Sequence, residues 1–132
     1  MQALIAVTPA HGPAARGHYS PGIRAGNLLF VSGQLALTPQ GESLAGADLE
    51  TQTRQALANL RAVVEAAGGT LDRVARVTAY LADPQGWPVF NRVFAEVFGA
   101  HRPARAVVPV QPFAGGFVVE VEAVAVLDDE PR

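Results

Sequence analysis

The stretch from His101 to Leu127 contains the residue types best suited to chemistry on a small acid. Arg105 precedes a β-branched run, and Glu120 and Glu122 lie in a later run of apolar residues. A guanidinium offers a carboxylate a planar fork of donors, and a carboxylate side chain can hold a water or move a proton. Because a short Pro/Gly turn separates the two runs, they predict a hairpin or close strand pair with Arg105 near the glutamates.

Two interpretations of this group are open at the level of sequence. An arginine at the start of a strand can form a structural ion pair with Glu120 or Glu122, and such pairs are common. Alternatively, Arg105 binds a substrate and a glutamate takes part in catalysis. Glu120 and Glu122 share a predicted strand face with Val124 and Val126, and buried carboxylates are rare unless paired or functional. That placement agrees with both interpretations.

Four further residues are weaker candidates. Tyr19 could line a pocket, although a single tyrosine is more often a packing residue. Ser32 and Gly33 fall late in a predicted strand, where glycine marks a bulge or permits a close approach, and the bulge is the simpler interpretation. Asn91 lies between two phenylalanines of a predicted helix and could reach a ligand or cap a backbone group.

The composition bounds the class of protein. A chain of 132 residues forms one domain, and its 17% of charged residues is below the usual quarter, which a buried subunit interface would explain. A net charge of −2 with scattered basic residues predicts no nucleic-acid partner. The absence of cysteine excludes thiol chemistry, and the dispersed histidines predict no metal site. Without a signal peptide or membrane-spanning run, we expect a cytoplasmic protein.

The residue pattern predicts two helices and one sheet. Residues 1–16 are an irregular segment or a short edge strand, and residues 18–24 and 28–35 flank a tight turn. Asp48 is the expected N-cap of a helix to Ala67, with an apolar stripe on one side and Gln52, Gln55, Asn59 and Arg61 on the other. Further elements are a strand at 74–81, a helix beginning at Asp83-Pro84 and ending at Gly99, and a last strand at 118–127.

The order β-β-α-β-α-β-β indicates an α+β domain, with two helices on one face of a mostly antiparallel sheet. Strand segments 28–31 and 118–127 are nevertheless apolar on both faces. A second apolar face exposed to water would be an unusually large patch, so we expect another subunit to cover it.

Together these segments resemble the RidA family, also called the YjgF/YER057c/UK114 family of reactive-imine deaminases. The resemblance covers nearly the whole chain, from about Gly17 to Val126. The matching segments are Gly17-His18-Tyr19-Ser20-Pro21-Gly22, Gly26-Asn27, Phe30-Val31-Ser32-Gly33-Gln34, the helix 52–69, the strand Val74–Asp83, Phe90-Asn91-Arg92-Val93-Phe94, Arg102-Pro103-Ala104-Arg105 and Val119-Glu120-Val121-Glu122-Ala123. Their order and spacing, rather than any single segment, make the resemblance specific.

The resemblance implies a chorismate-mutase-like (ferredoxin-like) α+β fold that forms a homotrimer, with sites between adjacent subunits and no cofactor. It assigns Arg105 to the substrate carboxylate and Glu120 to the attacking water. Tyr19, Ser32, Gly33 and Asn91 match positions that line the same cleft. The implied substrates are 2-aminoacrylate and related 2-imino acids, hydrolysed to 2-keto acids and ammonia as by a 2-iminobutanoate/2-iminopropanoate deaminase.

The chain departs from the family pattern at several positions, which leaves the subfamily and the substrate side chain open. The departures are His18 in place of Pro, Ala106 in place of Ser, Val107 in place of Cys or Thr, and Phe113-Ala114 in place of Leu-Pro. Two other functions are compatible with such a scaffold. One is a non-catalytic trimer that binds or senses a small acid, and the other, by fold analogy alone, is an isomerase or mutase of an aromatic carboxylate.

Overall fold

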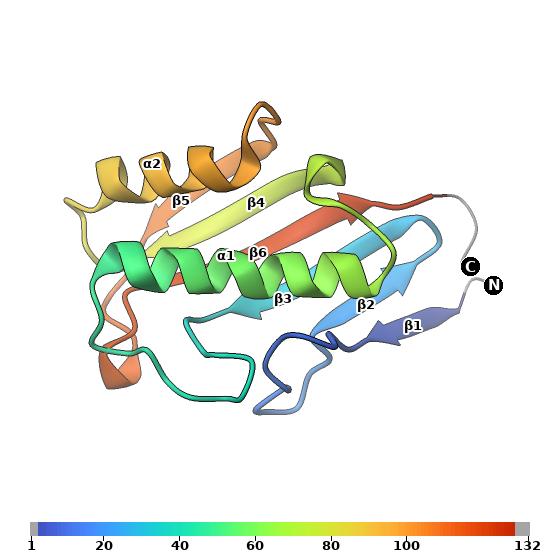
Figure 1. Ribbon diagram of the computed structural model, residues 1–132, viewed down its shortest axis with the longest axis horizontal. Helices are drawn as coiled ribbons and strands as arrows, with labels where there is room; N and C mark the ends of the chain where they lie inside the picture. Colours follow the sequence, from blue (N-terminus) through green and yellow to red (C-terminus); the bar gives the residue numbers. More distant parts are fainter. Residues whose placement is uncertain (1–2, 129–132) are drawn as a thin grey trace.

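The computed structural model describes residues 3–128 and shows an α+β fold in which two helices cover one face of a six-stranded sheet (Figure 1). The strand order is β1-β2-β3-β6-β4-β5, and every neighbouring pair except β4–β5 is antiparallel. The predicted fold class is therefore confirmed. The elements are β1 (Leu4–Val7), β2 (Gly22–Ala25), β3 (Leu28–Gln34), α1 (Leu49–Ala66), β4 (Val74–Leu81), α2 (Trp87–Phe98), β5 (Ala104–Pro109) and β6 (Val119–Val126), with single 3-10 turns at Leu71–Arg73 and Ala114–Gly116.

Helix α1 begins and ends as the sequence predicts. The Asp48 carboxylate accepts a hydrogen bond from the Thr51 N–H at 2.8 Å, which satisfies one of the free donors of the first turn. At the other end Gly68 adopts a φ of 86°, which an L side chain rarely adopts, and the Gly69 N–H returns to the Val64 carbonyl. The apolar stripe of α1 packs into the core against the sheet.

Two polar residues of α1 are not where the sequence places them. Gln52 and Asn59 were assigned to the solvent side of the helix, but both are buried. The Asn59 amide donates to the carbonyls of Leu35 and Leu37 at 3.0 and 2.8 Å. Since these partners lie on a loop distant in sequence, helical periodicity cannot reveal that a polar side chain belongs inside.

Strands β5 and β6 are not neighbours, so the predicted hairpin between them is wrong. Strand β4 lies between them, pairing in parallel with β5 and antiparallel with β6. The segment β4–α2–β5 is a crossover unit, in which the intervening helix allows two consecutive strands to run in the same direction. The last strand then occupies the centre of the sheet, next to β3 (Figure 1).

The start of α2 also differs from the prediction. The Asp83 side chain caps a turn by accepting from the Gln85 N–H at 2.9 Å, and the helix begins four residues later with Gly86 as its N-cap. A side chain at Gly86 would force Leu49 to move, because its Cβ would lie 2.4 Å from Leu49 Cδ2. Pro84 therefore belongs to the turn, and Pro88 lies in the first turn of the helix.

The face of the sheet opposite the helices, here called the open face, is partly apolar. Leu29 and Val31 are buried under the helices, as the alternation predicts, whereas Leu28 and Phe30 point the other way and are 38% and 45% exposed. Neither helix within residues 3–128 is long and apolar enough to cross a membrane.

The buried side chain of Gln52 should contribute to the free energy of unfolding through its hydrogen bonds. Its amide donates to the carbonyls of Ala47 and Gly116, both at 3.0 Å, and its carbonyl accepts from the Val118 N–H at 3.0 Å. A Gln52→Met substitution keeps the volume but removes these partners, and an unpaired buried polar group costs about 1–3 kcal/mol. We expect Gln52→Met to lower the free energy of unfolding by that order, measured by urea titration at fixed protein concentration.

The matched control is Gln55→Met, one turn further along the same helix. Gln55 is only partly buried, and its single bond is to the Asn59 side chain. We expect its effect to stay well below that of Gln52→Met. Equal stabilities of the two variants would show that Gln52 does not anchor the chain before β6.

Candidate functional site

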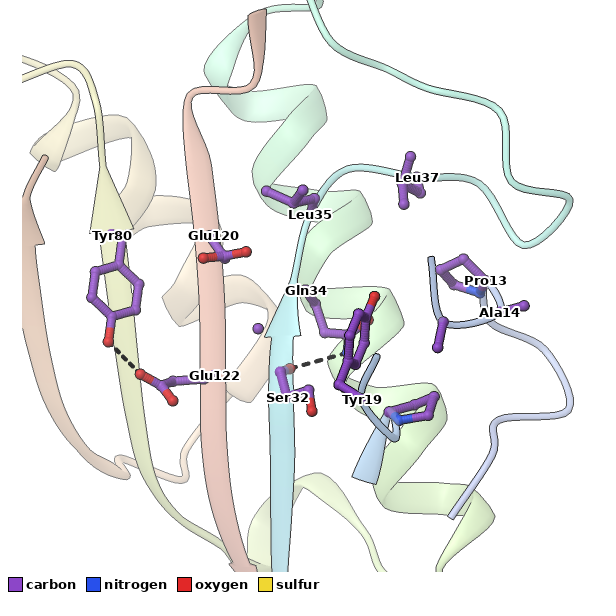
Figure 2. A pocket seen from close by; sticks show the side chains of 13 residues that line it. Pro13, Ala14, Tyr19, Ser32, Gln34, Leu35, Leu37, Tyr80, Glu120 and Glu122 are labelled. Atoms are coloured by element: carbon purple, nitrogen blue, oxygen red, sulfur yellow. Dashed lines mark hydrogen bonds between the residues drawn. The ribbon is translucent and has the colours of Figure 1, made fainter. Parts of the chain in front are cut away.

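A pocket of about 470 Å³ on the open face brings together four of the six predicted site residues (Figure 2). Tyr19 comes from the N-terminal loop, Ser32 and Gly33 come from β3, and Glu120 comes from β6. Two residues that were not among the predicted site residues, Tyr80 of β4 and Glu122 of β6, line the same pocket. The remaining lining residues are mostly apolar, namely Pro13, Ala14, Ala15, Pro21, Gln34, Leu35 and Leu37.

Glu120 is a partly buried carboxylate without a compensating partner among the residues that the structure describes. Among residues 3–128 no cation forms an ion pair with it, and no donor hydrogen-bonds to it. Burial raises the pKa of Glu120, and the negative charge of Glu122 raises it further. A carboxylate with a raised pKa is a better proton acceptor, so Glu120 suits the role of a general base.

The close approach of Glu120 to β3 requires a glycine. Between the pairs Val31↔Ala123 and Gln34↔Val121, two residues of β3 oppose one residue of β6, which is the predicted bulge. A Cβ on Gly33 would lie 2.9 Å from Glu120 Cδ and 3.0 Å from its Oε2. Both interpretations of Gly33 therefore hold, since the bulge also makes room for the carboxylate.

Ser32 and Tyr19 connect the N-terminal loop with the wall of the pocket. The Ser32 hydroxyl donates to the Ser20 carbonyl at 2.6 Å, and the Ser32 N–H donates to the Pro21 carbonyl at 2.9 Å. The Tyr19 hydroxyl accepts from the Arg16 N–H at 3.2 Å, while half of the side chain is exposed. Both residues therefore shape the pocket, and their contacts with a substrate stay a prediction.

Tyr80 is the lining residue that the sequence did not single out. Its hydroxyl donates a hydrogen bond to Glu122 Oε1, which is drawn in Figure 2. This bond and burial raise the pKa of Tyr80, so the phenol keeps its proton. The alternation of residues 76–81 places Tyr80 on the face opposite the helices, but its proximity to Glu122 depends on the pairing of β4 with β6.

Arg105 lies elsewhere, at the sheet edge under α2. Its guanidinium carbon lies 4.8 Å from the ring centre of Phe94, 5.7 Å from that of Phe90 and 5.9 Å from that of Trp87. These rings attract the cation without using its hydrogen-bond donors. Asn91 joins Arg105 in lining a hollow of about 550 Å³ beside α2.

Like Glu120, Arg105 has no partner of opposite charge in the described part of the chain. Within residues 3–128 its guanidinium donates no hydrogen bond and forms no ion pair, although the side chain is partly buried. Burial lowers the pKa of Arg105, but a guanidinium still stays protonated in proteins. A partly desolvated cation with free donors is suited to bind an anion.

One chain cannot bring Arg105 and Glu120 together. Arg105 pairs with Val77, whose side chain is buried under the helices, whereas Glu120 pairs with Tyr80 on the open face. Paired residues project to the same face, so the two charges lie on opposite faces of the sheet. The predicted meeting of the two within one chain is therefore wrong, and so is the structural ion pair.

The residues available limit the chemistry. All ten basic residues counted in the sequence are arginines, so no lysine can form a Schiff base with a substrate. No three His, Asp or Glu side chains of residues 3–128 are grouped as ligands of a metal ion. What the two sites offer is a guanidinium that can bind an anion and a carboxylate that can activate a water.

Comparisons with known proteins identify the family of the chain. The profile of a family described as Endoribonuclease L-PSP matches residues 9–127. A RutC family protein of Pyrococcus horikoshii is 41% identical over 87% of this chain and 91% of its own length. The chloroplastic Reactive Intermediate Deaminase A of Arabidopsis thaliana is 35% identical over 92% of this chain and 65% of its own length. The crystal structure of E. coli TdcF with bound serine superposes with a TM-score of 0.87 at 30% identity, covering 92% of this chain and 98% of that one. The chain therefore belongs to the Endoribonuclease L-PSP family, the RidA family to which its sequence motifs point, and that family includes a named reactive intermediate deaminase.

Proposed function

We propose that this protein is a hydrolytic deaminase of reactive enamines and imines, converting 2-aminoacrylate and related 2-imino acids into 2-keto acids and ammonia. The observation that carries the proposal is a pair of uncompensated, partly buried charges, Arg105 and Glu120. A substrate carboxylate would supply the anion that Arg105 lacks. Glu120 would hold the water that attacks the imine carbon.

The proposal includes assembly of the chain into a homotrimer with its sites between subunits. Because Arg105 and Glu120 lie on opposite faces of one sheet, a site that uses both needs the Arg105 face of one copy beside the open face of another. The exposed side chains of Leu28 and Phe30 supply apolar surface that such a contact would cover.

The chemistry asks for orientation and one proton acceptor. The enamine first tautomerises to the imine, and binding of its carboxylate by Arg105 fixes the position of the electrophilic carbon. Glu120 accepts a proton from water as the water oxygen bonds to that carbon, and the proton passes to nitrogen. The hydroxyl group of this carbinolamine then gives up its proton, a proton reaches the nitrogen, and the C–N bond breaks as the C=O bond forms, releasing ammonia and the keto acid. A positioned carboxylate typically contributes about 10²–10⁴-fold to such a step.

Names of two relatives support the substrate class. Arabidopsis Reactive Intermediate Deaminase A gives the type of reaction by its name. The TdcF structure holds serine, a small molecule with a carboxylate and a nitrogen on the adjacent carbon. A 2-imino acid has the same two groups at the same separation, so a site that accepts one geometry suits the other.

The activity is tested by generating imines in situ with an amino-acid oxidase and measuring release of ammonia and keto acid. Arg105→Lys keeps the charge but loses the planar fork, and Arg105→Ala loses both. We expect Arg105→Lys to lose most of the deaminase activity and Arg105→Ala nearly all, with the assembly intact by light scattering. Unchanged hydrolysis in Arg105→Ala would remove Arg105 from the mechanism.

Glu120→Gln separates catalysis from binding. It preserves the shape but removes the proton acceptor, so we expect turnover to fall by about 10²-fold or more while binding of a keto-acid product stays equal or tightens. In the wild type, protonation of Glu120 should abolish turnover as pH falls. Because the pKa of Glu120 is raised, this loss should begin at a higher pH than for an exposed glutamate.

Steady-state deamination and calorimetric titration of a keto acid, performed on the same preparations, check this expectation. Glu122→Gln, two residues away on the same face, is the matched control and should have the smaller effect on turnover. A wild type that binds the keto acid but never turns over an imine would instead identify a non-catalytic small-acid binder.

Mixing two inactive variants tests the placement of the site. If Arg105 and Glu120 act from different chains, a trimer containing both Arg105→Ala and Glu120→Gln chains keeps one intact site. Since each mixed trimer keeps one of its three sites, we expect the purified mixed trimers to recover about a third of wild-type activity. Co-expression with two affinity tags, followed by purification of mixed assemblies, provides the sample.

The mass of the assembly also tests whether the site lies between the subunits of a trimer. A trimer has three times the chain mass of 13.8 kDa. A monomer at micromolar concentration, or mixed trimers with no recovered activity, would contradict a site between subunits even if imine hydrolysis itself is observed.

A further inference from the structure

The two glutamates of β6 look equivalent in sequence but not in the structure. Glu120 and Glu122 are two residues apart on the open face, and both line the same pocket. A hydroxyl donor reaches only one of them: Tyr80 donates to Glu122 Oε1, while no hydrogen bond within residues 3–128 reaches Glu120. Figure 2 shows the Tyr80 ring beside β6, with its hydroxyl directed at Glu122 and away from Glu120.

We propose that Tyr80 is a positioning residue that makes the acidic pair unequal, because its hydroxyl fixes Glu122 as a charged neighbour and leaves Glu120 as the single carboxylate free to hold a water. The strand pairing enforces this arrangement. Tyr80 is paired with Glu120 and Thr78 with Glu122, so the long tyrosine side chain passes Glu120 and ends at the next acidic residue. A hydrogen bond to a charged acceptor is among the stronger kinds, which keeps Glu122 in place.

Few charged or titratable side chains surround Glu120 and Glu122 among residues 3–128. On the open face Glu120 and Glu122 share their pocket with Tyr80 of β4 and Tyr19 of the N-terminal loop, and Arg76 of β4 lines a neighbouring hollow together with Glu122. Arg76 is exposed and forms no ion pair with either glutamate among residues 3–128. Among residues 3–128, Tyr80 is thus the group that hydrogen-bonds to one carboxylate and not to the other. Two close carboxylates without such a donor tend to share one proton, as like charges disfavour double ionisation.

A double-mutant cycle of Tyr80 and Glu122 should change the titration of the acidic pair in a defined direction. In Tyr80→Phe the ring remains but the donor is lost, so Glu122 is free to share a proton with Glu120. The pH at which the pair gives up its last proton should then rise by about half a unit or more. Glu122→Gln should shift the midpoint of Glu120 in the opposite direction, since it removes the neighbouring charge. Adding Tyr80→Phe to Glu122→Gln should produce no further shift, because no second carboxylate is left to share the proton.

The measurement is the carbon-13 resonance of labelled glutamate carboxyls against pH in the assembled protein, with the acid limb of the deamination rate as a parallel readout. Although the consequence for turnover rests on the proposed function, the carboxyl titration does not. Tyr19→Phe removes the other phenol of the pocket, which bonds to the Arg16 N–H rather than to a carboxylate, and should leave the midpoint in place.

The titrations of these variants distinguish a positioning role of Tyr80 from a packing role. An upward shift in Tyr80→Phe that disappears in the Glu122→Gln background supports the positioning role. No shift in Tyr80→Phe, or the same shift in both backgrounds, would reduce Tyr80 to a packing residue. If the titrations behave as expected but the wild type hydrolyses no imine, the positioning stands and the deaminase proposal fails.

Discussion

The alternation of side chains across the central strand is the constraint on which this structure depends. Strand β6 has a partner on each side, and every second residue, such as Val119 and Val121, is buried beneath the helices. The residues between them, Glu120 and Glu122, must therefore project from the other face. The same two-residue period in β4 and β5 sends Arg105 to the helix side. The core and the separation of the two charges are consequences of one geometric rule.

The parts of the fold that follow from local sequence were predictable. Asp48 and the glycines after α1 mark the ends of that helix, and the alternation in β3 places Leu28 and Phe30 on the open face. What local sequence does not contain is which strands pair, so Arg105 was expected beside the glutamates although β4 separates β5 from β6. Gln52 was misplaced for a related reason, since its partners belong to distant loop backbone.

Electrostatics divides the surface into compensated and uncompensated parts. On the outer side of the helices, Glu50, Arg54, Arg92 and Glu96 form a closed ring of four ion pairs between α1 and α2. These exposed pairs link the two helices, and pairs of this kind contribute little each. Arg105 and Glu120 receive no such partner within the described chain, although each is more costly to leave alone because it is partly buried. An unpaired charge retained at that expense is characteristic of a binding or catalytic group.

The bulge in β3 determines what deletion of a single residue would do to this fold. The pairs on either side of it, Val31 with Ala123 and Gln34 with Val121, lie on the same buried face. Loss of Gly33 would restore a regular ladder between these pairs without turning any other side chain of β3 to the opposite face, because the side-chain period is two. The remaining strands would keep their register, while the space that receives the Glu120 carboxylate would close. At this point a one-residue deletion alters the site and leaves the architecture intact, so the pocket can be gained or lost independently of the fold.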